Sequence, residues 1–157
     1  MNKLLPRILT AVLALPILFL GTPSVARADD MTCPPPTPVA VDIKPGNSQN
    51  RIKLSSSGVL AVAVLTTSDF DATVFTPEMA HLNDAGVAMT AGCTGAAAVR
   101  WSLDDENGDG RLDLVFFFKI QDLTLTVNST AATLMAHGSY SGTETHIVGT
   151  DSVQVVP

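Results

Sequence analysis

Apolar and polar residues alternate along short stretches of the chain from residue 39 onward, which is the period of a β-strand with one buried face. Residues 97–103 and 151–156 alternate in this way, while residues 58–67 and 112–120 form longer apolar runs typical of fully buried strands. Beyond residue 39, no segment keeps a helical apolar period over the length of a helix. The pattern therefore predicts about eight to ten short strands and no long helix.

Turn-forming residues separate the predicted strands. Pro45-Gly46 ends a strand at residues 39–44, and Ser141-Gly142 separates two stretches that we expect to pair as a hairpin. Residues 121–132 fit a strand or a short helical turn. This arrangement predicts an all-β domain over residues 40–157, an antiparallel Greek-key β-sandwich of immunoglobulin-like type, with a small β-barrel as the alternative. Further predicted strands cover residues 72–77, 79–84, 86–90, 133–140 and 145–149.

The first residues have the pattern of an export signal. Lys3 and Arg7 precede an apolar run at residues 8–21, and the small-x-small sequence of residues 26–28 follows it. This order predicts a secretory signal peptide over residues 1–28 and a secreted or periplasmic protein. A retained anchor is the alternative, although the run is short for a membrane span of about 20 residues. A Pro-rich lead-in follows at residues 29–39.

The chain is acidic. The predicted cleavage removes Lys3, Arg7 and Arg27, so the formal net charge falls by three, from −6 to −9. Such a charge disfavours nucleic acid and anionic membrane surfaces as partners and favours cations. We expect no membrane span once the signal is removed.

Two cysteines, Cys33 and Cys93, follow the predicted signal peptide. An exported chain with two cysteines favours one disulfide between them, because disulfides persist in oxidising compartments. Two independent thiols are the alternative.

Residues 105–113, with the sequence DENGDGRLD, have the spacing of a calcium-binding loop. Oxygen-bearing side chains recur on alternate positions of a tight loop and converge on one centre, and Gly110 allows the backbone to reverse. Oxygen donors without His or Cys select Ca²⁺ over transition metals. The predicted ligands are Asp105, Asn107, Asp109, the backbone carbonyl of Arg111, and Asp113.

The loop departs from an EF-hand in two ways. Position 12 is Phe116 where an EF-hand has a bidentate Glu, and a strand follows where an EF-hand has a helix. We therefore expect a structural site with an affinity in the extracellular range, about 10⁻⁴ to 10⁻³ M, and no calcium sensor. Asp104 or a distant carboxylate could supply the missing ligand. The alternative is an ordinary Asn-Gly, Asp-Gly turn with solvated charges.

With these residues in place, the chain resembles a largely uncharacterised family of secreted bacterial modules. The family opens on V-D-I-K-P-G, carries S-x-D-F-D, passes through D-x-N-G-D-G-x-x-D and ends near G-T-D-S-V-x-V-V-P. The corresponding segments are residues 41–46, residues 68–71 in a shorter form, residues 105–113 and residues 149–157. The resemblance covers the whole predicted domain and implies a calcium-binding β-sandwich. It implies no activity.

Other chemistry has weaker support in the sequence. His137 and His146 would face each other across the predicted hairpin, but a stable metal site needs three or four ligands, so we interpret the imidazoles as ordinary exposed residues. Trp101 and other aromatic residues could form a carbohydrate platform. No G-x-S-x-G, H-E-x-x-H or phosphate loop is present. We therefore expect a non-enzymatic module that binds calcium and has a structural or adhesive role. An extracellular protein or a glycan is the further partner that we expect. The alternative is a carbohydrate- or cell-envelope-binding module.

Overall fold

The computed structural model of the protein describes residues 36–87 and 94–157. The predicted signal peptide, Cys33, Cys93 and residues 88–90 of a predicted strand lie outside the described residues, so the disulfide stays a prediction. Within the described ranges, no helix has both the length and the apolar character needed to cross a membrane.

The described residues form an all-β fold, as the sequence predicts. The chain's strands, in order, are β1 (Thr37–Pro38), β2 (Val41–Ile43), β3 (Arg51–Lys53), β4 (Val59–Val64), β5 (Phe75–Asp84), β6 (Ala96–Asp104), β7 (Asp113–Lys119), β8 (Ala131–Tyr140), β9 (Thr143–Ser152) and β10 (Gln154–Val156).

The strand order is that of two overlapping Greek keys. An 8-stranded sheet has the order β1-β9-β8-β5-β6-β7-β4-β2. Strands β5, β6 and β7 are consecutive neighbours, and β8 returns to the free side of β5 while β4 lies beside β7. All pairs in this sheet are antiparallel except β1 with β9. A separate two-stranded sheet pairs β10 with β3 in parallel.

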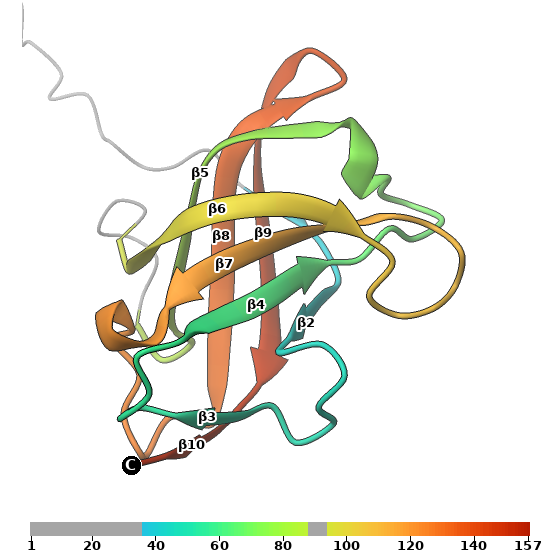
Figure 1. Ribbon diagram of the computed structural model, residues 1–157. Coiled ribbons are helices and arrows are strands. Elements are labelled where there is room, and N and C mark those ends of the chain that lie inside the picture. Colours follow the sequence, from blue (N-terminus) through green and yellow to red (C-terminus); the bar gives the residue numbers. More distant parts are fainter. Residues whose placement is uncertain (1–35, 88–93) are drawn as a thin grey trace, which may run out of the picture. The chain divides into compact units, whose positions relative to one another are not determined.

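The large sheet is curled, so that its two halves face each other across the core. Strands β6, β7 and β4 run steeply across β8 and β9 (Figure 1). Only two residue pairs, His81 with Ala97 and Leu82 with Ala96, join the halves between β5 and β6. The result lies between a sandwich and a half-barrel, because the two layers remain parts of one sheet.

One short segment connects the two edges of the curled sheet. Thr37 and Pro38 pair with β9, and the backbone N–H of Val39 donates to the carbonyl of Val148. The carbonyl of Ala40 accepts from Leu65 instead, and β2 continues along β4. The end of the predicted Pro-rich lead-in is therefore part of the sheet.

The core fills the space inside the curl. Alternate residues of β4 and β7 face inward, and their partners come from β5, β8 and β9, because side chains on a strand alternate between its two faces. Fully buried side chains of this core include Val62, Val64, Leu82, Leu114, Phe116, Phe118, Leu134 and Ile147.

Two local elements differ from those predicted, and a predicted hairpin is confirmed. Residues 72–77 and 79–84 form one strand, β5, after a 3₁₀ turn at Ala72–Val74, and a bulge between Pro77 and Met79 accommodates the proline within that strand. Strand β3 was not predicted, because only one of its three residues is buried. The β8–β9 hairpin is confirmed, with Ser141 and Gly142 both at positive φ (50° and 84°), as a two-residue hairpin turn requires.

Candidate functional site

The predicted calcium loop connects β6 to β7 at one end of the curled sheet. Asp104, the last residue of β6, pairs with Asp113, the first residue of β7. Gly108 and Gly110 have φ values of 74° and 84°, a region that side chains disfavour. The glycines that the sequence pattern singles out therefore lie where the backbone turns back.

Asp105 organises the loop by accepting hydrogen bonds from its backbone. Its Oδ1 accepts from the N–H groups of Gly108 (2.8 Å) and Asp109 (3.1 Å), and its Oδ2 accepts from Gly110 (2.9 Å). An ionised carboxylate has about four acceptor positions, so one remains open.

Asp109 is held by its neighbours in the loop. Its Oδ1 accepts from the backbone N–H of Arg111 at 2.9 Å, and its Oδ2 lies 3.3 Å from Nη2 of the Arg111 guanidinium. The bond from the Arg111 backbone is the main reason why the pKa of Asp109 lies below its ordinary value. Asn107 accepts from the N–H of Asp109 at 2.9 Å. Arg111 also donates to the carbonyl of Thr67, so a basic side chain of the loop partly balances its charge.

Asp113 is fully buried. Its Oδ1 accepts from the backbone N–H of Thr66 at 2.8 Å, and its Oδ2 accepts from Glu106 at 3.1 Å. Among the described residues, no Lys, Arg or His forms an ion pair with it. A buried carboxylate without a positive partner is costly unless hydrogen bonds or a cation compensate it.

The loop's acidic side chains do not converge on one point in this structure. In the described part of the chain, Asp105, Asp109 and Asp113 do not form a group whose carboxylate oxygens all lie within 4.8 Å of one another. Phe116, at position 12, points into the core and is almost fully buried. This position therefore cannot supply a ligand, because β7 directs it to the inner face.

Further carboxylates surround the loop. Burial, followed by the charges of Asp104, Asp113 and Asp42, raises the pKa of Glu106 above its ordinary value. Burial and then the charge of Asp151 raise the pKa of Asp42 in the same way. This end of the domain is therefore strongly negative, and a cation here would relieve repulsion between several carboxylates.

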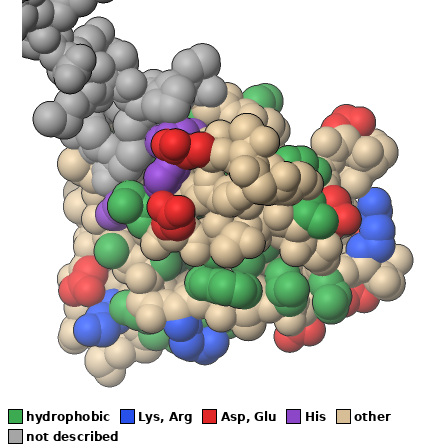
Figure 2. Space-filling model, turned by 90° about the horizontal axis from the view of Figure 1, so that it is seen from above, with side chains coloured by type: hydrophobic (Ala, Val, Ile, Leu, Met, Phe, Trp, Pro, Cys, Tyr) green, Lys and Arg blue, Asp and Glu red, His purple; other side chains and the backbone are tan. Residues whose placement is uncertain are grey.

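A cleft of about 300 Å³ opens where β5 and β6 separate. Its lining consists of residues 77–80 of β5, residues 98–101 of β6 and Phe116 of β7. Trp101 is 49% exposed, although its register partner is the buried Phe116. With β5 no longer paired beside it, this part of β6 is uncovered. Met79 and Trp101 are among the large hydrophobic side chains that are exposed. Figure 2 shows hydrophobic side chains spread across one face of the molecule.

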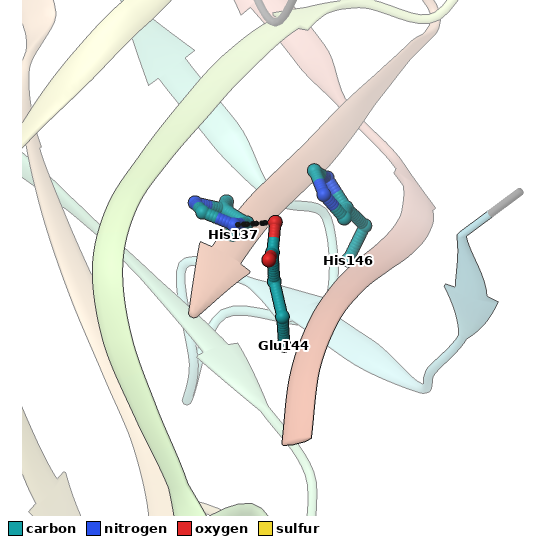
Figure 3. Close-up of side chains that lie close together, drawn as sticks. All are labelled: His137, Glu144 and His146. Atoms are coloured by element: carbon teal, nitrogen blue, oxygen red, sulfur yellow. Dashed lines mark hydrogen bonds and ion pairs between the residues drawn. The ribbon is translucent and has the colours of Figure 1, made fainter. Parts of the chain in front are cut away.

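His137 and His146 face each other across the hairpin, as the sequence predicts, but they are partly buried and are not the exposed residues that we expected. His137 of β8 and His146 of β9 are directly opposite each other, and their ring centroids are 4.5 Å apart. Glu144, two residues before His146 on β9, points to the same pair and lies 3.1 Å from Nε2 of His137 (Figure 3). Glu144 was not among the residues predicted from the sequence. Its spacing of two residues from His146 on the predicted hairpin was the available signal.

Comparisons of the chain with models of protein families, with curated protein sequences and with solved structures found no match.

Proposed function

We propose that this protein is an exported, non-enzymatic β-module that binds one structural Ca²⁺ in the loop of residues 105–113. The observation that carries the proposal is the buried carboxylate of Asp113, which adjoins the acidic loop and lacks a basic partner among the described side chains. The resemblance of four segments to a family of secreted calcium-loop modules supports the same function.

The donor set fits calcium chemically. The side chains of Asp105, Asn107, Asp109 and Asp113 and the carbonyl of Arg111 supply oxygen only, which suits a hard cation. The three carboxylates accept hydrogen bonds from backbone N–H groups. Each carboxylate still has at least one acceptor position open for an ion. Glu106, whose pKa is raised by burial and then by its acidic neighbours, lies within the loop and is a candidate for the ligand that Phe116 does not supply.

The role of the ion would be structural or adhesive. By tying Asp113 to the loop, Ca²⁺ would link the ends of β6 and β7 to Thr66 after β4, and so rigidify one end of the sheet. With no bidentate Glu, the affinity should be about 10⁻⁴ to 10⁻³ M, which suits a calcium-rich exterior.

Calorimetric titration of the chelator-treated protein with Ca²⁺, together with thermal melts, tests this function. We expect one bound ion and a higher melting temperature at millimolar Ca²⁺, because a ligand that favours the folded state stabilises it. Asp109→Asn should weaken both effects, and the matched control Asp122→Asn, at an exposed position outside the loop, should not. Absence of heat and of thermal stabilisation at millimolar Ca²⁺ would refute the proposal.

A second candidate function is glycan binding in the β5–β6 cleft. The exposed Trp101 carries this candidate, since an indole face in a groove can stack on a sugar ring. The cleft also contains Arg100 and Glu78, which could hydrogen-bond to hydroxyl groups. A glycan array probed in the presence of Ca²⁺ should give hits that Trp101→Ala abolishes, and an array without hits would remove this candidate.

A further inference from the structure

We propose that His137, Glu144 and His146 form a binding site for one divalent transition-metal ion, with Zn²⁺ as the model ion. The site lies on the β8–β9 hairpin and shares no residue with the calcium loop. It is therefore independent of the calcium binding proposed above.

The hairpin register brings the three ligands together. His137 and His146 are a directly opposed cross-strand pair, and Glu144 lies diagonally across from His137. One ligand atom from each of the three side chains lies within 4.8 Å of the other two. In a tetrahedral zinc site, ligand atoms about 2.0–2.1 Å from the ion are roughly 3.3 Å apart. The 3.1 Å between Nε2 of His137 and a Glu144 oxygen is close to this separation.

The ligand atoms can move closer together, because one of the three side chains is free to move. Glu144 is 77% exposed, so its carboxylate can change rotamer at little cost, while His137, 19% exposed, is held by packing. The two imidazoles come from adjacent paired strands and are thus placed by the backbone. Both rigid ligands are present before the ion binds, which reduces the entropy that binding costs.

The donor types select the metal. Two imidazoles and one carboxylate suit Zn²⁺, Cu²⁺, Ni²⁺ or Co²⁺, whereas Ca²⁺ and Mg²⁺ prefer oxygen alone. Three protein ligands leave at least one position for water or for a group on a partner, as in open zinc sites.

A second carboxylate lies beside one of the imidazoles. Nδ1 of His137 lies 3.5 Å from a Glu78 oxygen, on the side of the ring away from Glu144. If Glu78, which is 65% exposed, moved closer and accepted a hydrogen bond from Nδ1–H, the Nε2 lone pair would be left to the metal, as in the usual carboxylate–histidine–metal arrangement. Glu78 is therefore a positioning residue.

His146 has a nitrogen that lacks a partner. Its Nδ1 is buried and makes no hydrogen bond with the described residues. An unpaired buried nitrogen is unfavourable, and it is one of the two atoms that His146 can offer to an ion. Coordination through Nδ1 would remove this penalty.

The test is calorimetric titration of the intact, chelator-treated chain with Zn²⁺ at neutral pH, with millimolar Ca²⁺ present so that Ca²⁺ sites are filled. We expect one Zn²⁺ per chain, and Co²⁺ substitution should give the visible absorption of a tetrahedral site. His137→Gln, His146→Gln and Glu144→Gln should each weaken Zn²⁺ binding by at least about tenfold. Glu78→Gln should weaken it by about tenfold and leave the stoichiometry unchanged.

The matched control is His81→Gln. His81 is on β5 and also has a buried, unpaired Nδ1, but it is outside the ligand group. Its substitution should leave Zn²⁺ affinity unchanged. Because Glu144 is exposed, Glu144→Gln tests the site even if a histidine variant folds poorly. No Zn²⁺ binding, or binding that survives Glu144→Gln undiminished, would overturn the proposal, while calcium binding would be unaffected by either result.

Discussion

The carboxylate of Asp113 accepts a hydrogen bond at 2.8 Å from the backbone N–H of Thr66, a residue 47 positions earlier in the chain. Thr66 in turn donates its hydroxyl to the carbonyl of Leu112 at 2.7 Å. These two bonds join the acidic loop to the segment that leaves β4. The buried carboxylate therefore has a structural role whether or not an ion is bound.

Asp113→Ala should destabilise the protein by about 3 kcal/mol in the presence of chelator, because the N–H groups of Thr66 and Glu106 lose a charged acceptor. Urea unfolding measures this change. Asp122→Ala, at an exposed position, should stay within about 0.5 kcal/mol of the unsubstituted protein. Equal stabilities for the two variants would contradict the structural role of Asp113.

Arg111→Gln should increase the calcium affinity several-fold. The substitution keeps the backbone carbonyl that we assign as a ligand, but it removes a guanidinium that competes for the carboxylate of Asp109 at 3.3 Å. Calorimetric titration with Ca²⁺ compares the two proteins. If the residues form only a solvated turn, neither protein will bind Ca²⁺ and no difference will be seen.

Asp42→Asn should stabilise the protein at neutral pH. Burial and the charge of Asp151 raise the folded-state pKa of Asp42 above 3.8, so the folded state binds the proton more tightly than the unfolded state does. The stability that protonated Asp42 contributes is therefore lost as the pH rises through its folded-state pKa. Asn does not ionise, so the variant does not lose this stability. The difference should vanish as the pH falls below 3.8. Thermal melts from neutral pH down to below pH 3.8 measure this stability difference. Asp122→Asn should show no comparable dependence on pH.

Gly149→Ala should destabilise the protein by about 1–3 kcal/mol, the usual cost of overpacking. A Cβ at this position would clash with Cγ1 of Val41 and would meet the carbonyl oxygen of Val39 at 2.8 Å. It would therefore push away the segment that connects the two sheet edges. Gly58→Ala, where the nearest atom is the hydroxyl of Ser56 at 3.3 Å, is the control and should be nearly neutral. Urea unfolding of both variants decides between these outcomes.

Trp101 should report directly on the cleft, because it is the single tryptophan of the chain. At 49% exposure, its fluorescence should be readily quenched by acrylamide in the folded protein. Trp101→Ala should cost less than about 1.5 kcal/mol, against about 3–5 kcal/mol for its buried register partner in Phe116→Ala. A blue-shifted emission that resists quenching would show that the cleft is closed in solution.

The sequence by itself determined the β-class of the protein, most strand positions and the turns. Alternation of apolar and polar residues depends on one strand and one buried face, so residues 97–103 and 112–120 could be read locally. The hairpin turn at Ser141-Gly142 and the reversal at Gly110 are equally local, because they depend on backbone freedom at one or two residues. The acidic loop could be predicted from its residue spacing for the same reason.

Only the tertiary structure decided how these elements meet. Strand pairing between distant segments is not encoded in any short window, so the connection of the sheet edges by residues 37–43 and the exposure of Trp101 were not foreseeable. The same reason applies to the contact between Asp113 and Thr66. In the His137, Glu144 and His146 group, the sequence supplied the residues, but the register of β8 against β9 brought their ligand atoms within reach of one ion.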